Sequence, residues 1–489
     1  MKKRFIAVMP AVVAAFMLMF AACGPSAPAG GAEGGEGGQA GPESEGEGAA
    51  AESSVHSEGG VVEKGCQSGM QKDVITIRGV RPSSGAGAVS ERTGFGPQYR
   101  MWADEVNKAG GLYVRSLDRR VMVDVLVYDD GSDIAKTTQL FEQVCMGEKP
   151  DLLLAPYGTA SLLECSPVAQ KYDYLLLAAE GGFKELEKLL PPGGGNTNTF
   201  AMLNCSETQA PALAKLFEEL GVSSVYCVYE DDRLGIEYWG ATKTALDRIG
   251  VEVRGIQAVP FDGNFDPEAV VGAAKNSGAE AFLVYAGESS GIRITSESAW
   301  QGYDPDLYLV GPGGSCDYFG LEAFGDPTNA ALEGMVSLGA WNAGSAAHGA
   351  GAGEYSARFR EYYTGKGMFW KDADGTYDPG GTVFQDWWGH ICFYSALQVM
   401  QQAVEEAGEL MDDGRINNLT LVDYIAKNSF DTAMHPRLRF NGNALTDDMY
   451  PGNIGQWQDG VFEVIDTDSR RTADPVYPKP SWHIEWPGE

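Results

Sequence analysis

The order of strand-like and helix-like segments constrains this chain more than any other feature. From about residue 73, short runs rich in β-branched residues alternate with segments of helical periodicity, and the whole series occurs twice. Strands that alternate with helices form parallel sheets covered by helices on both faces. We therefore predict an α/β protein with two doubly wound parallel-sheet lobes, joined by a hinge around a central ligand cleft.

The expected elements form two series and a return segment. The first series predicts strands at 74–80, 121–128, 151–155 and 174–178, and helices at 94–109, 134–146 and 161–171. The second predicts helices at 207–220, 234–249, 267–276 and 291–301, and strands at 224–229, 251–259, 280–286 and 307–310. An irregular region rich in Gly, Ala and aromatic residues is expected at 340–382, followed by helices at 384–407 and 419–428.

The N-terminus has the pattern of a secretory signal over residues 1–22. Residues 2–4 are basic, and residues 5–22 carry no charge and are mostly apolar. Cys23 follows directly, which resembles a bacterial lipobox. We expect Cys23 to be lipidated and to hold the protein on the outer face of the cytoplasmic membrane. The alternative is a soluble protein cut near Cys23.

The segment that follows Cys23 consists mainly of Gly, Ala, Ser, Pro and Glu up to residue 65. Such a composition cannot bury enough apolar surface to fold. Repulsion among its glutamates extends the chain, which gives it a reach of roughly 35 Å. We therefore expect residues 23–65 to be a lipidated, disordered, acidic tether.

Charge and motifs exclude several function classes. The formal net charge of -32 repels phosphate backbones, so nucleic acid is not an expected partner. After residue 23 no apolar run is long enough to cross a bilayer. The segment 372–378 resembles a calcium loop but lacks the distal Glu, so a turn is expected there. We expect no cofactor and no metal.

Cysteine usage leaves the redox state open. Seven of the eight cysteines remain when Cys23 is set aside, so at least one thiol stays free even if export permits disulfides. Cys145, Cys227 and Cys392 lie in apolar runs and are expected to be buried thiols.

The loops after the predicted strands are candidates for ligand contact, because ligands of doubly wound sheets bind beyond the carboxyl ends of the strands. These loops are rich in Gly and Ser, which lets backbone amides approach a ligand closely. They lie at 82–85, 157–161, 180–182, 287–291 and 311–315.

Several short stretches that span nearly all of residues 73–485 form a recognisable series. They read Glu105-Val-Asn-Lys-Ala-Gly-Gly111, Val127-Tyr-Asp-Asp130, Ala155-Pro-Tyr-Gly-Thr-Ala-Ser161, Val168-Ala-Gln-Lys-Tyr172, Phe265-Asp266, Phe282-Leu-Val-Tyr-Ala-Gly287 and Leu309-Val-Gly-Pro312. In their order and spacing these stretches resemble type I periplasmic binding proteins of the branched-chain amino-acid and amide-binding group. The resemblance implies two lobes joined by three chain crossings, closure around a small solute, and delivery to the membrane permease of an ABC importer. The alternative is a sensory receptor of the same fold that feeds a signalling partner.

The resemblance also implies domain boundaries. We expect the first lobe to comprise residues 66–199 and 338–445, and the second lobe to comprise residues 200–337 and 446–489. A monomer is expected.

The resemblance implies a role for individual site residues. Thr159 lies at the position where the amino-acid binders of the family have a hydroxyl residue that binds the ligand carboxylate, and Ser161 is close by. The loop Glu180-Gly181-Gly182 stands where family members offer backbone amides and a second hydroxyl, which Gly182 lacks. Tyr285 lies where the second lobe closes over the ligand.

The family's carboxylate for the ligand amino group falls near Gly313, which has no side chain. An amino-acid ligand would then need Glu180 or Glu288 in its place, because an unpaired buried ammonium is unfavourable. A neutral amide or urea is the alternative ligand.

Each candidate also has a plain structural interpretation. Thr159 and Ser161 could cap the following helix. Tyr157, Tyr285 and Trp387, all candidates for ligand contact, could be packing aromatics, and Glu180 could be a solvated loop charge.

An enzymatic alternative rests on Gly287-Glu-Ser-Ser-Gly291, which matches the nucleophile elbow of serine hydrolases with Ser289 as nucleophile. The duplicated lobes do not fit a single hydrolase sheet. We therefore predict that the chain is not an enzyme.

Overall fold

The structure is a computed structural model. It describes residues 52–55, 72–341, 349–363 and 388–484, apart from 86, 182–185, 192, 205, 261–262, 317, 327 and 483. Everything below concerns this part of the chain.

The first lobe contains two sheets. In one of them, β2 (Val74–Arg81) lies between β4 (Arg119–Asp129) and β5 (Leu152–Leu153) and is parallel to both. In the other, β6 (Leu176–Ala178) is parallel to β7 (Thr199–Ala201), and the strands β13 (Ser429–Phe430), β14 (Leu438–Asn441) and β15 (Ala444–Leu445) extend it. Helices α3 (Gly96–Lys108), α4 (Ile134–Gln143) and α5 (Thr159–Lys171) connect these strands.

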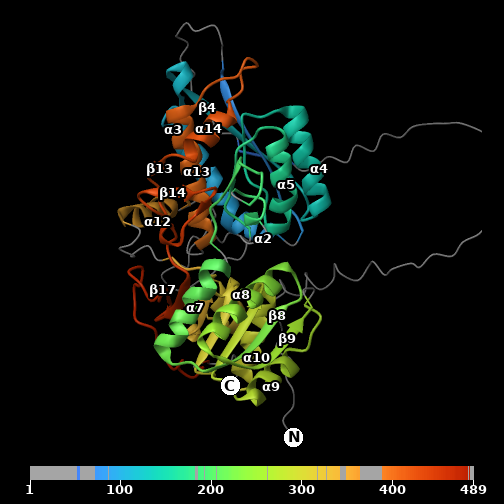
Figure 1. The fold of residues 1–489 in the computed structure, drawn as a ribbon, viewed down its shortest axis with the longest axis vertical. Helices are drawn as coiled ribbons and strands as arrows, with labels where there is room; N and C mark the ends of the chain where they lie inside the picture. Colours follow the sequence, from blue (N-terminus) through green and yellow to red (C-terminus); the bar gives the residue numbers. More distant parts are fainter. Residues whose placement is uncertain are drawn as a thin grey trace, which may run out of the picture. The chain divides into compact units, whose positions relative to one another are not determined.

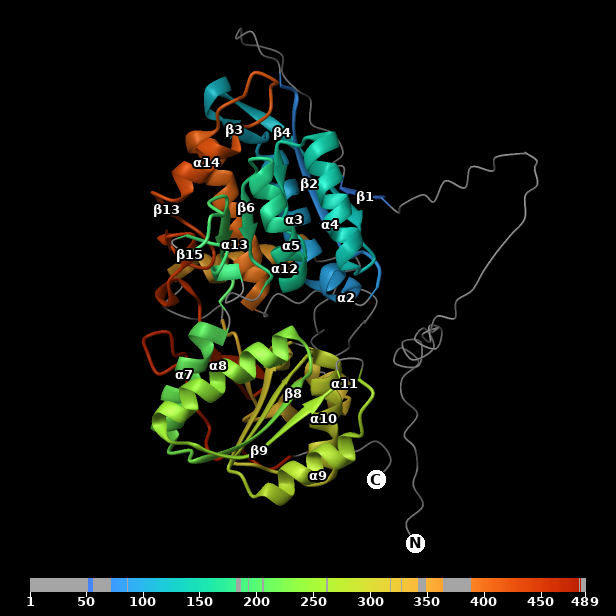
Figure 2. The same ribbon diagram turned by 45° about the vertical axis from the view of Figure 1, so that its right-hand side comes forward.

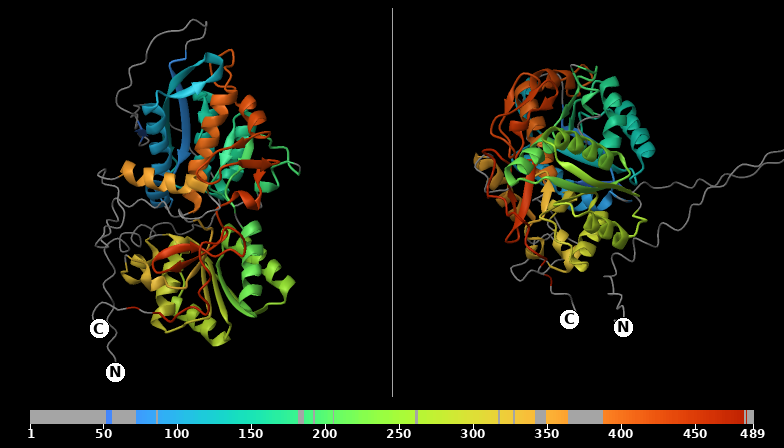
Figure 3. Two further views of the ribbon diagram at one scale, coloured as in Figure 1. Left: turned by 90° about the vertical axis from the view of Figure 1, so that its left-hand side faces the viewer. Right: turned by 60° about the horizontal axis from the view of Figure 1, so that its bottom comes forward.

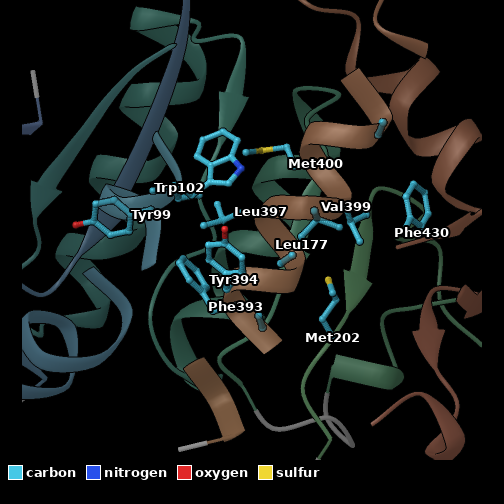
Figure 4. Close-up of a cluster of buried hydrophobic side chains, with 14 of the residues drawn as sticks. Tyr99, Trp102, Leu177, Met202, Phe393, Tyr394, Leu397, Val399, Met400 and Phe430 are labelled. Atoms are coloured by element: carbon cyan, nitrogen blue, oxygen red, sulfur yellow. The ribbon is translucent and has the colours of Figure 1, made fainter. Parts of the chain in front are cut away.

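A distant return segment completes this lobe. It contains α12 (Gly349–Tyr363), α13 (Trp388–Ala407) and α14 (Asn418–Ile425), and Figure 1 shows α13 and α14 beside α3 and β4. Trp102 of α3 is buried with Leu397 and Met400 of α13 (Figure 4), and its indole N–H donates to Gln401 Oε1 at 3.0 Å. The return segment is therefore an integral part of the first lobe's core.

The second lobe contains one sheet of seven strands in the order β17-β16-β12-β11-β10-β8-β9. The strands β8 (Ser224–Glu230), β9 (Glu252–Val259), β10 (Ala281–Ala286), β11 (Leu307–Pro312) and β12 (Val336–Leu338) are parallel. The C-terminal strands β16 (Ile454–Gln458) and β17 (Val461–Val464) join antiparallel, and Figure 3 shows these red strands with the yellow and green strands of this lobe.

Helices cover both faces of this sheet. One face packs against α7 (Ser206–Leu220) and α8 (Arg233–Ile249), and the other against α9 (Pro267–Ser277), α10 (Glu288–Trp300) and α11 (Phe319–Phe324), as Figure 2 shows for α8, α9 and α10. Local signals fix the helix ends: the Asp266 side chain accepts from Glu268 N, Pro267 follows as the first helical residue, and Gly278 ends α9 at φ 63°. The predicted α/β fold with two lobes is confirmed.

Three details differ from expectation. Glu52–Val55, within the expected tether, forms β1 and pairs antiparallel with β4, whose outer edge would otherwise lack a backbone partner there. The helix α12 lies in the region expected to be irregular. It was not predicted because its high Gly and Ala content obscured the helical pattern of the aromatic residues that it buries. β7 pairs with β6, so Phe200 and Ala201 belong to the first lobe.

None of the described helices is both long and apolar enough to pass through a membrane.

Candidate ligand-binding site

The predicted site residues follow the carboxyl ends of parallel strands in both lobes, where ligands of such sheets bind. In the first lobe, Tyr157 and Thr159 come after β5, and Glu180 and Gly181 come after β6. In the second lobe, Glu288 follows β10, and the turn 313–315 follows β11.

An ion-pair cage around Arg81, the last residue of β2, dominates the edge of the first lobe. The guanidinium donates to Glu180 through Nη1–Oε1 at 2.6 Å and Nη2–Oε2 at 2.8 Å. It also donates to Glu91 Oε2, from Nε at 2.8 Å and from Nη2 at 2.6 Å, and from Nη1 to the Ala155 carbonyl at 2.6 Å. The Arg81 side chain is completely buried. We call Arg81, Glu91 and Glu180 the Arg81 cage.

Glu180 is therefore neither a solvated loop charge nor free to bind a ligand, because both of its oxygens accept from Arg81. Burial raises the pKa of Glu180 from its ordinary 4.5 to about 8, although Arg81 opposes the rise. Sequence reasoning missed Arg81 and Glu91. The available signal was a charged residue at the end of an apolar strand.

Thr159 and Gly181 lie against each other. A Cβ on Gly181 would be 3.1 Å from Thr159 Cα and 2.3 Å from Leu162 Cδ1, so a larger residue here would force Leu162 to move and would crowd Thr159. Thr159 is the first residue of α5 and half-buried, Ser161 is buried, and the N-cap position belongs to Gly158, which has no side chain. The two predicted ligand loops of the first lobe are thus brought together.

Tyr157 lies at the same edge. Its ring stands edge-on to Phe95, with the centroids 5.8 Å apart. Burial raises the pKa of the Tyr157 hydroxyl, and the carboxylate of Glu288 raises it further. Tyr157 of the first lobe is therefore electrostatically coupled to Glu288 of the second.

Glu288 occupies the space that the missing side chain at Gly313 leaves open. A Cβ on Gly313 would lie 2.7 Å from Glu288 Cγ and 3.1 Å from Glu288 N. Glu288 is half-buried, and Cys316 Sγ lies 4.0 Å from its Oε1. Burial raises the pKa of Glu288, and no cation among the described residues acts to lower it.

Tyr285 does not point to this edge, contrary to expectation. It is completely buried, its hydroxyl lies 2.7 Å from Thr242 Oγ1, and its ring stacks on Tyr238 with the centroids 5.8 Å apart. Successive side chains of a strand point to opposite faces, and this position of β10 faces α8. Tyr285 is a packing residue.

Glu230 at the end of β8 is a second carboxylate that sequence reasoning missed. It is buried, and Gly287 N donates to its Oε2 at 2.8 Å. This bond fixes the start of the loop that carries Glu288.

The remaining candidates need only brief comment. Gly182, Trp387, Cys23 and the turn at 372–378 lie outside the described residues. The expected burial of Cys145, Cys227 and Cys392 is confirmed, and all three are free thiols. No group of three potential metal ligands occurs in the described ranges.

The hydrolase alternative finds no support at Ser289. This serine is exposed in the first turn of α10 in the second lobe. The structure describes two histidines, and both lie in the first lobe: His390 stands against Phe95 at 5.3 Å, and His435 Nδ1 accepts from Arg437 N.

The raised pKa of Glu180 predicts a pH dependence of stability. Between pH 4.5 and about 8 the folded protein holds a proton on Glu180 that unfolding releases, so this group lowers stability as the pH rises. Glu180→Gln removes the titration. We expect the melting temperature of the unaltered protein to fall relative to that of Glu180→Gln as the pH is raised from about 5 to about 8. A difference in melting temperature that does not change with pH would contradict this.

The chain is similar to known proteins in sequence pattern and in fold. A family model described as periplasmic binding protein matches residues 74–460. Among solved structures, a leucine binding protein from Thermotoga maritima is similar, with 13% identity, a TM-score of 0.61 and coverage of 80% of this chain and 97% of that one. The branched-chain amino acid transporter substrate binding protein from Streptococcus pneumoniae, in complex with isoleucine, has 15% identity, a TM-score of 0.61 and coverage of 83% and 100%.

A solute binding protein of an ABC transporter from Rhodopseudomonas palustris BisB5, in complex with 3,4-dihydroxybenzoic acid, has 14% identity, a TM-score of 0.60 and coverage of 85% and 99%. At such identities these structures establish the fold alone. The family model spans most of the chain, and the two lobes seen here agree with the fold of these structures. The chain therefore belongs to the periplasmic binding protein family and has its type I fold.

Proposed function

We propose that this chain is the solute receptor of an ABC importer and binds a small amino-acid-like solute between the carboxyl edges of its two lobes. Family membership supports the class of function. The titles of similar structures name leucine, isoleucine and an aromatic acid as ligands of those proteins, so the ligand class must be argued from this chain's own residues.

The observation that carries the ligand class is Glu288. Glu288 is a half-buried carboxylate that no cation of the described residues faces, which is unfavourable, and closure around a solute removes still more water from it. A ligand ammonium would supply the missing partner. An aromatic carboxylic acid would instead place a second negative charge beside Glu288, which is repulsive.

The first lobe supports the other half of such a ligand. Thr159 and the backbone at Gly181 lie in contact, at the start of α5. Helix N-termini and backbone N–H groups favour anions, so this edge suits a ligand carboxylate. Amino acids carry both charges, and Glu288 thus replaces the carboxylate that Gly313 cannot provide.

The partners and location follow from the same proposal. The receptor is a monomer that delivers its solute to a membrane permease, and Cys23 carries the lipid that anchors it to the outer face of the cytoplasmic membrane. The acidic segment after Cys23 keeps the lobes away from the membrane surface.

Glu288→Gln tests the ligand class. We expect L-leucine or L-isoleucine to bind the unaltered protein, and the variant to bind roughly 10- to 100-fold more weakly, because a hydrogen bond to a charged group contributes about 1.5–3 kcal/mol. Calorimetry measures both affinities. The matched control is Glu297→Gln on the same helix, where Glu297 accepts from Gln301 Nε2 at 2.8 Å. Equal affinities for Glu288→Gln and the unaltered protein, or binding of 4-hydroxybenzoate in preference to every amino acid, would refute the assignment.

Cys23→Ser tests the anchor. The variant should move from the membrane fraction to the soluble fraction when cells are fractionated, because no lipid can be attached. A variant that stays with the membrane would show that Cys23 is not the anchor.

A further inference from the structure

The Arg81 cage joins three segments that are far apart in sequence. Glu91 begins the helical turn Glu91–Phe95, Ala155 precedes the loop to α5, and Glu180 follows β6. Arg81 donates to all three, at distances between 2.6 and 2.8 Å. These contacts use all five of its N–H groups, which is the full capacity of a guanidinium.

Two of these segments carry the proposed ligand loops. The Ala155 carbonyl lies two residues before Tyr157 and four before Thr159. Glu180 directly precedes Gly181, whose backbone touches Thr159. The position of both loops therefore depends on the bonds that one side chain makes.

The cage is buried, and in this environment of low dielectric its hydrogen bonds are electrostatically stronger than in water. Aromatic rings enclose the guanidinium, with the Phe95 centroid 5.5 Å and the Phe393 centroid 5.0 Å from Arg81 Cζ. The Tyr99 hydroxyl donates to the remaining oxygen, Glu91 Oε1, at 3.1 Å.

Stability alone does not account for this cage. Two buried carboxyl groups face one guanidinium, and burial already favours the protonated form of Glu180, so desolvation of the buried groups offsets their attraction to Arg81. Apolar residues of similar volume often stabilise a core as well or better. The planar guanidinium of arginine, unlike an apolar side chain, can hold several hydrogen-bond acceptors in fixed positions at the same time.

We propose that Arg81 is a positioning residue for ligand binding: it holds the loops of Thr159 and Gly181 in the arrangement that receives the solute before the solute arrives. This inference rests on the proposed ligand edge. The role of the cage is then to preorganise the ligand loops. Preorganised loops increase the affinity for the solute, because they lose less conformational entropy on binding.

The test uses hydrogen–deuterium exchange on the full chain without added ligand. Arg81→Met alone leaves two buried carboxylates unpaired and could unfold the lobe. The main variant is therefore Arg81→Met combined with Glu91→Gln and Glu180→Gln, which contains no buried charge in the cage. Arg78→Met is the matched control, because Arg78 also lies on β2 but pairs with Asp124 and Glu148.

We expect exchange of the amides at 156–162 and 181 to accelerate at least tenfold in the triple variant, while amides of β4 and α13 exchange as before. Arg78→Met should leave the loops unchanged. Unaltered loop exchange in the triple variant would overturn the proposal. Faster exchange throughout the first lobe would also overturn it, because Arg81 would then serve stability alone.

Affinity for L-leucine and L-isoleucine separates this inference from the proposed function. The triple variant should bind the amino acid that the unaltered protein binds at least tenfold more weakly and associate with it more slowly. Should the unaltered protein bind neither, the proposed ligand class fails, while the exchange rates still decide whether Arg81 positions the loops. Equal affinity of both proteins would overturn the positioning role.

Discussion

A fully buried arginine fixes the working edge of the first lobe. Arg81 ends β2, and its five donors tie the segments that begin at Glu91, Ala155 and Glu180 to that strand. Because every donor of a buried guanidinium needs an acceptor, the three segments are coupled through Arg81. The return segment is bound to the same arrangement, since Phe393 of α13 covers the guanidinium. Arg81 thus links the edge of the sheet, the two ligand loops and the core of the lobe.

The carboxylates at the edge of the second lobe have different surroundings from those of the Arg81 cage. Glu230 accepts from Gly287 N and holds the loop after β10, whereas Glu288, the residue after Gly287, faces no cation from the described part of the chain. Gly313 makes room for the Glu288 side chain, since any larger residue would collide with it. In the first lobe the buried carboxyl groups of the cage contact Arg81, whereas none of the cations that the structure describes faces Glu288 in the second lobe. This asymmetry is expected of a site that binds a charged group from solution.

Sequence patterns predicted the lobes but only part of the site. Alternating periodicity located β10 and α8 because both are long and regular, and the Gly- and Ser-rich loops marked the strand ends. Tyr285 was assigned wrongly, since the sequence of a strand buried on both faces does not say which face meets α8 and which meets α10. The partners of Arg81 come from positions 91, 155 and 180, and no local pattern connects residues brought together by tertiary structure.

Native mass spectrometry of freshly purified protein tests the central claim most directly, because a receptor that closes over its solute often retains it. We expect a retained small molecule that contains a basic nitrogen, because no cation among the residues that the structure describes faces Glu288. A retained solute without any group that can carry a positive charge would contradict the account.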